Sequence, residues 1–142
     1  MKYVLPLLVM ATFAVGSLAN IFISSDEWYE KLVKSSLNPP GYVFGIVWPI
    51  LYVLMGVVSY LSAEKIWRLF IPQLILNAAW SWIFFYLHQP VIALINIGVL
   101  LVLNIAILMV VRKSSLEFFL YLPYILWLFF ASFLNASIVF LN

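Results

Sequence analysis

The sequence has no cysteine, a single histidine and very few charged residues. The lack of cysteine excludes disulfides, thiolate metal sites and cysteine nucleophiles. One histidine, His88, is too few for an ordinary zinc or haem-iron site. Charged residues make up 8% of the 142 residues, whereas soluble domains have about 25%. The chain therefore lacks the polar surface that a water-soluble fold needs.

Hydrophobic residues make up 67% of the chain and aromatic residues 18%. The net charge of +2 is too small to favour a nucleic-acid partner. The charged residues occur in small groups and leave long uncharged stretches at 3–25, 35–63, 69–111 and 118–142. A spanning helix needs about 20 apolar residues, so these stretches predict helices that cross a membrane.

The third stretch is too long for one span, and Pro90 divides it, because proline in the first helical turn starts a new helix. We predict one transmembrane domain over residues 1–142, an all-α bundle of five transmembrane helices. The expected helices lie near 4–23, 42–61, 69–87, 91–111 and 118–140. The first apolar run is longer than the core of a signal peptide, so we expect it to be a span.

Basic residues in short loops predict the orientation of the bundle. The side that holds the N-terminus has most of them, namely Lys2, Lys65, Arg68, Arg112 and Lys113. The other side has Lys31 and Lys34. We therefore expect a multi-pass membrane protein with a cytoplasmic N-terminus, an external first loop and an external C-terminus.

Polar residues inside the spans mark inward faces, because an unsatisfied polar group is costly in lipid. Gln73 and Asn77 share a face of the third span, and Asn96 and Asn104 share a face of the fourth. Two interpretations stay open. These amides join helices through hydrogen bonds worth roughly 0.6–2 kcal/mol each, or Asn77 also belongs to a ligand site.

Large aromatic side chains also recur at helical spacing. On the second span the stripe contains Phe44, Trp48 and Tyr52, and on the last span it contains Tyr124, Trp127, Ala131 and Leu134. With Gly45 and Ala131 as gaps, two such stripes can form a slot for a large, flat, apolar ligand. A close-packed core is the alternative. The spans have no carboxylate pair and no phosphate-binding glycine loop, which disfavours hydrolysis and phosphoryl transfer.

Several ordered sequence blocks carry a family likeness. They are WYEKL at 28–32, NPPG at 38–41, LYVLMG at 51–56, QLILNAAWS at 73–81 and PYILW at 123–127. Together they resemble the translocator protein family, also known as the tryptophan-rich sensory proteins. The resemblance runs from about Gly16 to Asn135.

The resemblance implies a bundle of five helices, often a homodimer, with the first loop as a lid over a pocket. It implies porphyrin ligands such as protoporphyrin IX, with sterols or benzodiazepine-type ligands in some members, and no metal or required cofactor. Carried over by position, the pocket contains Phe44, Gly45, Val47, Trp48, Asn77, Trp80, Ile92, Ala131 and Leu134, with Trp28 in the lid loop. Trp48 and Trp127 match the tryptophans implicated in light-dependent porphyrin breakdown by some bacterial members.

Three features depart from the family pattern. Leu37 replaces a common tryptophan, and Ser35 follows Lys34 where proline is usual, which removes a backbone constraint from the lid. The family's cholesterol motif needs a tyrosine and then a basic residue, and segment 134–142 has neither. These departures weigh against cholesterol recognition there and favour a prokaryotic cell membrane as the location.

Three hypotheses follow. The leading one is a receptor or transporter-like protein that holds a porphyrin between Trp48 and Trp127, with Asn77 and Trp80 at its edge. The second is an enzyme that degrades porphyrin in light, with Trp48 and Trp127 as catalytic electron donors. The third is a membrane scaffold or stress regulator that acts through partner proteins. The expected partners are the ligand, the lipid bilayer and a second copy of the chain.

Overall fold

The computed structural model describes residues 1–24 and 27–142, with the backbone alone described at 20–24. Within these ranges every regular element is helical, which confirms the all-α class. The long helices are α1 (Val4–Ser24), α3 (Gly41–Leu61), α4 (Ala63–Ser81), α5 (Pro90–Val110) and α6 (Ser115–Leu141). The short elements are α2 (Trp28–Lys31) and the π-helix η1 (Trp82–Tyr86). Positions 25–26 of the predicted first loop lie outside the described residues.

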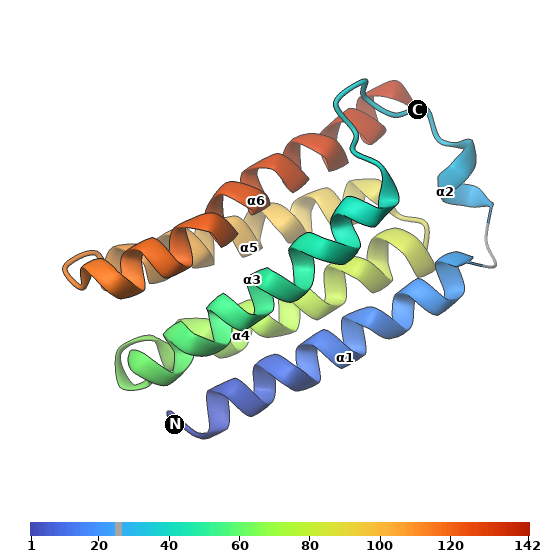
Figure 1. Ribbon diagram of the computed structural model, residues 1–142. Helices are drawn as coiled ribbons and strands as arrows, with labels where there is room; N and C mark the ends of the chain where they lie inside the picture. The colour runs from blue at the N-terminus through green and yellow to red at the C-terminus, as the bar shows by residue number, and fades with distance from the viewer. Residues whose placement is uncertain (25–26) are drawn as a thin grey trace.

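The long helices run side by side in a bundle (Figure 1). Helix α4 contacts α1 and α5, α6 contacts α5 and α3, and α3 contacts α1, so the long helices close into a ring. The N-terminus and the α3–α4 and α5–α6 connections lie at one end of the bundle (Figure 1). The C-terminus, α2 and the connection from α4 to α5 lie at the other end.

Four stretches are long and apolar enough to cross a membrane by length and composition: α3, α4 continued through η1 (Ala63–Tyr86), α5 and α6. In α1 the stretch Val4–Ala19 is a shorter apolar helix. The outer faces carry large apolar side chains such as Val53 and Val102, which are 66% and 67% exposed. Such faces suit contact with lipid rather than with water.

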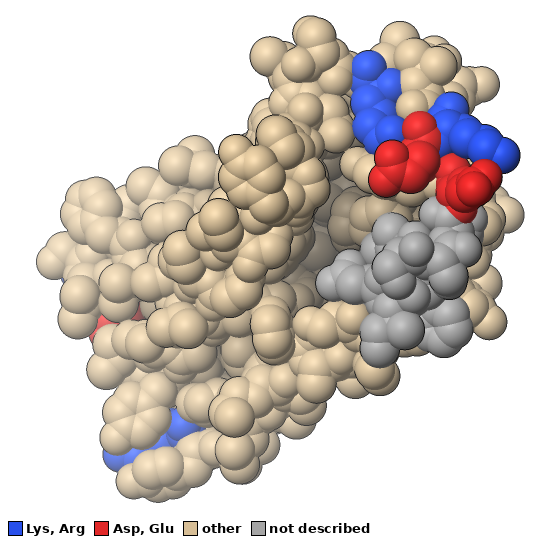
Figure 2. Space-filling view, turned by 45° about the vertical axis from the view of Figure 1, so that its right-hand side comes forward, with Lys and Arg blue, Asp and Glu red and all other residues tan. Residues whose placement is uncertain are grey.

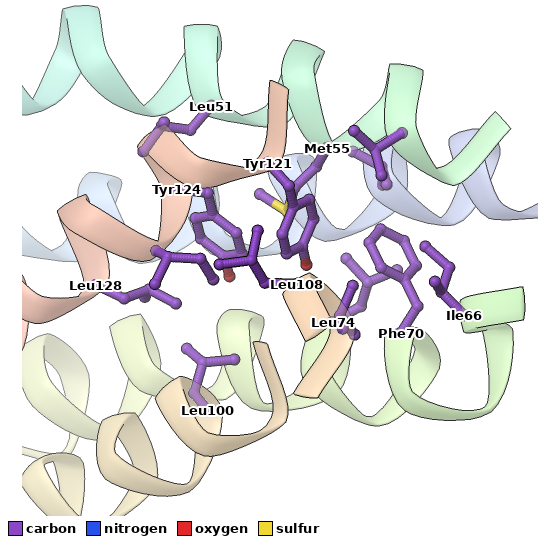
Figure 3. Close-up of a cluster of buried hydrophobic side chains, with 14 of the residues drawn as sticks. Leu51, Met55, Ile66, Phe70, Leu74, Leu100, Leu108, Tyr121, Tyr124 and Leu128 are labelled. Carbon is purple, nitrogen blue, oxygen red and sulfur yellow. The ribbon is translucent and has the colours of Figure 1, made fainter. Parts of the chain in front are cut away.

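The interior of the ring is filled near the α3–α4 connection. Side chains of α3, α4, α5 and α6 meet there, among them Met55, Phe70 and Tyr121 (Figure 3). These three are 0% exposed. In a membrane, close packing of this kind is a main source of attraction between helices. This end of the bundle is therefore closed, and the space inside the ring lies toward the opposite end.

Helix α4 begins earlier than the sequence predicts. The expected range starts at residue 69, but the helix starts at Ala63 and includes the charged Glu64, Lys65 and Arg68. Charged side chains limit the part of a helix that lies in lipid, but they leave its backbone hydrogen bonds intact. The charge pattern therefore locates the span and not the full helix. For the same reason α6 begins at Ser115 rather than at residue 118.

The π-helix η1 ends the third long segment. Its wider turn is closed by the Leu87 N–H, which donates to the Trp82 carbonyl at 2.9 Å. His88 follows with a φ of 56°, and Pro90 begins α5. Short π segments within helices occur frequently at functional sites.

Candidate functional site

The open end of the ring holds a cavity of about 680 Å³. All the long helices and η1 contribute to its lining, and residues between Tyr29 and Gly41 form its mouth. Figure 2 shows the hollow in this face of the molecule. Pockets for small ligands occupy about 300–1,000 Å³, so the cavity has the size of a ligand site.

Most of the predicted ligand-binding residues line this cavity. They are Phe44, Gly45, Trp48, Tyr52, Asn77, Trp80, Trp127, Ala131 and Leu134. They come from α3, α4 and α6, so the stripes seen on separate helices meet at one space. Their role in binding stays a prediction.

The other predicted residues lie outside the described lining. Ile92, in the first turn of α5, is 52% exposed, whereas its neighbour Ala93 is 0% exposed. A position carried over from a family does not fix which way a helix turn faces. Val47 packs against the buried core, Tyr124 is fully buried, and Trp28 lies in α2.

Trp48 of α3 and Trp127 of α6 are in direct contact. Their ring centroids are 6.3 Å apart and their planes meet at 87°, the edge-to-face geometry that aromatic quadrupoles favour. Phe44 makes a similar contact with Trp127, with centroids 5.7 Å apart. Rings in contact leave no space for a third, so a ligand between Trp48 and Trp127 stays a prediction that requires the two rings to separate. The pair forms one wall of the cavity.

Trp80 of α4 forms a second aromatic wall with η1. Its ring stacks on Phe84, with centroids 5.3 Å apart and planes at 23°, and meets the edge of Phe85 at 5.8 Å. The Trp80 Nε1 donates to Asn135 Oδ1 at 3.0 Å, and Asn135 Nδ2 donates to the Pro90 carbonyl at 2.9 Å. Ring packing and a hydrogen bond together fix the plane of the Trp80 indole.

A hydrogen-bonded network begins at the inner end of the cavity. The Tyr52 hydroxyl donates to Asn77 Oδ1, and Asn77 Nδ2 donates to the Tyr124 hydroxyl at 2.7 Å. The Tyr124 hydroxyl donates to Gln73 Oε1 at 3.0 Å. Tyr52 and Asn77 line the cavity, so they are the members of the network that a ligand can reach.

The network continues into the closed half of the bundle. Asn104 Nδ2 donates to Gln73 Oε1 at 3.1 Å, and the Tyr121 hydroxyl donates to Asn104 Oδ1. All three residues are 1% exposed or less, so the network joins α3, α4, α5 and α6 inside the bundle. This supports the helix-joining interpretation of Gln73 and Asn104. Sequence reasoning missed Tyr121, although it shares a helix face with Tyr124 and a hydroxyl in lipid needs a partner.

The segment at the cavity mouth is attached to the bundle by ring contacts, which include those of Trp28 and Tyr29 with Phe84 of η1, and by hydrogen bonds. The Trp28 ring stacks on His88, with centroids 4.4 Å apart and planes at 10°. The Val33 N–H donates to Asn142 Oδ1 at 3.1 Å, and Asn142 Nδ2 donates to the Val33 carbonyl at 2.9 Å. The segment is therefore joined both to the residues after η1 and to the end of α6.

Charged groups line the cavity at its mouth alone, so far as the described residues show, as Glu30 and Lys34. Burial raises the pKa of the Tyr29 phenol above its usual value, and the hydrogen bond from Asn38 opposes this less strongly. In the described part of the chain, no three His, Asp or Glu side chains are grouped as metal ligands. The groups presented to a ligand are aromatic rings, amides and hydroxyls.

Proteins of known name resemble this chain along most of its length. The model of the TspO/MBR family matches residues 5–141. The Tryptophan-rich protein TspO of Archaeoglobus fulgidus is 34% identical over 143 residues, which cover 94% of each chain. The protein of the same name from Chlorobaculum tepidum is 34% identical over 150 residues, covering 97% of this chain and 95% of its own. The human Translocator protein is 38% identical over 125 residues, covering 79% of this chain and 73% of the human one.

Proposed function

The chain belongs to the TspO/MBR family of membrane proteins, and from this premise we propose that it binds a porphyrin such as protoporphyrin IX in the cavity between its helices. The observation that carries the proposal is the pair of aromatic walls, Trp48 with Trp127 and Trp80 with Phe84, around one space. Aromatic contacts contribute about 0.5–1.5 kcal/mol each beyond area burial. A flat, apolar macrocycle is the ligand that gains most from such walls.

The proposed topology has α1 as a fifth span. Helix α1 has 21 residues, as many as α3 and α5, and a core of about 30 Å needs about 20. The first turn of α4, with Lys65, and the α5–α6 connection, with Arg112, lie at the N-terminal end of the bundle (Figure 1). By the positive-inside rule this end faces the cytoplasm of a prokaryotic cell. The cavity mouth then faces outward.

The segment from α2 to Gly41 is proposed to be a lid. Its residues line the mouth of the cavity, and the contacts of Trp28 with His88 and of Val33 with Asn142 hold it there. Movement of the segment away from the bundle would break these contacts and widen the mouth. With the segment in place, the covered ligand is shielded from water.

Protoporphyrin should quench the tryptophan emission of the purified protein in a saturable way, with a dissociation constant on the order of micromolar. Quenching is expected because Trp48, Trp80 and Trp127 line the cavity. The measurement is a fluorescence titration in detergent micelles, with N-acetyltryptophanamide in the same micelles as the control for light absorption. Linear quenching equal to that of the free indole would contradict the proposal.

A second function, light-dependent degradation of the bound porphyrin, is favoured by the contact between Trp48 and Trp127. An indole at the cavity wall can donate an electron to the light-excited macrocycle, and a second indole 6.3 Å away can share the radical that is left. Dioxygen would then add to a bridging carbon of the reduced macrocycle, and return of the electron to the oxidised indole would leave a ring-opened product that contains both oxygen atoms. No metal is needed for these steps.

Illumination should bleach the bound porphyrin more slowly in a Trp48→Phe, Trp127→Phe double variant than in the wild type. The rate is followed by absorbance and expressed per bound porphyrin, so that a change in affinity does not affect it. Trp67→Phe is the matched control, since Trp67 lies outside the described lining. Equal bleaching rates in all three proteins would show that Trp48 and Trp127 do not drive the bleaching. The proposal of porphyrin binding would then stand without an enzymatic function.

A further inference from the structure

Charged side chains of α2 and the segment after it gather beside the cavity. Figure 2 shows acidic and basic groups together on this part of the surface, next to the hollow. Two of them, Glu30 and Lys34, line the mouth, and Lys34 is the one basic residue among the described lining residues. The cavity thus changes from a neutral aromatic interior to a charged mouth.

The Lys34 ammonium is held in place by neutral groups. Its Nζ lies 4.4 Å from the centroid of the Tyr29 ring, as in a cation–π contact. The same atom donates to the Leu32 carbonyl at 3.3 Å, and the side chain is partly buried. None of the described carboxylates comes within 4.0 Å of it. Among the residues that the structure describes, this positive charge is therefore positioned without a carboxylate to neutralise it.

The neighbouring charges are arranged differently. Lys31 forms an ion pair with Glu27 at 3.3 Å, and their side chains are 76% and 80% exposed. Glu30 is exposed as well, so water and salt screen its charge. Lys34 is thus the group at the mouth that is both oriented by the protein and able to receive an anion.

We propose that Lys34 recognises a carboxylate at the edge of the ligand while the aromatic walls hold the apolar body. The inference rests on the proposed function and narrows its ligand class to flat, apolar molecules with an acidic group. Protoporphyrin carries its carboxylates on one edge of the macrocycle, whereas a sterol is neutral. Because a partly exposed ion pair contributes little free energy, Lys34 selects among ligands and supplies a small part of the affinity.

Comparing protoporphyrin with its dimethyl ester isolates the contribution of the carboxylates to binding. The ester keeps the macrocycle and loses the negative charges. Both are titrated into the wild type, Lys34→Gln and Lys31→Gln. Lys34→Gln should bind the diacid about fivefold more weakly and the ester unchanged. Lys31→Gln should bind both as the wild type does. High salt should reduce the fivefold difference.

Unchanged binding of the ester by Lys34→Gln shows that this variant is folded. The inference is overturned if Lys34→Gln weakens neither ligand, or both equally, or if Lys31→Gln gives the same selective loss. Porphyrin binding by the wild type would stand in each of these cases. Failure of the wild type to bind either porphyrin overturns the proposed function and this inference together.

Discussion

Replacing Ala131 with phenylalanine is expected to lower the affinity for protoporphyrin by about tenfold to a hundredfold. Ala131 is 5% exposed and lines the cavity one turn after Trp127. A phenyl ring there occupies space that the ligand needs, and forcing both into one site costs about 1–3 kcal/mol. The measurement is the titration of tryptophan emission with protoporphyrin.

The control is Ala136→Phe, on the same helix. Ala136 is outside the described lining, so this variant should bind protoporphyrin as the wild type does. Thermal unfolding of both variants separates a filled cavity from a loss of folding. Unchanged affinity in a folded Ala131 variant would place the ligand elsewhere on the protein.

Replacing Asn104 with leucine is expected to lower the free energy of unfolding by about 1–3 kcal/mol. Asn104 accepts a hydrogen bond from Tyr121 and donates to Gln73 Oε1 at 3.1 Å. The change leaves the Tyr121 hydroxyl without this partner, whereas Gln73 Oε1 keeps the hydrogen bond from the Tyr124 hydroxyl. Each buried polar group left unsatisfied costs about 1–3 kcal/mol. Thermal or denaturant unfolding in a fixed detergent measures the loss.

Asn96→Leu is the matched control, with the same change on the same helix. In the described part of the chain, the Asn96 side chain donates one bond, to the Leu76 carbonyl at 3.0 Å. Its loss should cost about 0.6 kcal/mol, the average for one interhelical bond in a membrane. Similar losses in the two variants would show that the network adds nothing to its individual bonds.

The uncharged stretches predicted where the long helices lie, because lipid penalises charge along a span. The agreement is close where helix and span coincide, as for α3, which is expected at 42–61 and observed at Gly41–Leu61. It is poor at the start of α4, where the helix extends into the charged region. The charge pattern thus predicts which residues lie in the bilayer better than it predicts where the helices begin and end.

Helical periodicity predicted which residues share a wall of the cavity. Phe44, Trp48 and Tyr52 lie on one face because their spacing follows the helical repeat. Periodicity does not fix how close two faces approach, and the contact between Trp48 and Trp127 depends on that approach. The outward position of Ile92 has the same cause, since the rotation of α5 is set by its packing.

The placement of Lys34 could not be predicted from local sequence. The side chain of a lysine in a polar loop is ordinarily exposed to solvent. The position of the Lys34 side chain depends on the path of the loop. That path is fixed by contacts between residues far apart in the chain, such as Val33 with Asn142. The ring contact of Lys34 with Tyr29 follows from the same path.

The polar network also bears on how the walls of the cavity can move. It joins α3, α4, α5 and α6, and none of its described members belongs to α1. Among the described side chains of other helices, the bond that reaches α1 is from Trp82 Nε1 to the Val15 carbonyl, at 2.9 Å. Among the described side chains, α1 also packs against the network helices through apolar contacts, such as that of Phe13 with Tyr52. The described network therefore ties α3, α4, α5 and α6 to one another independently of α1.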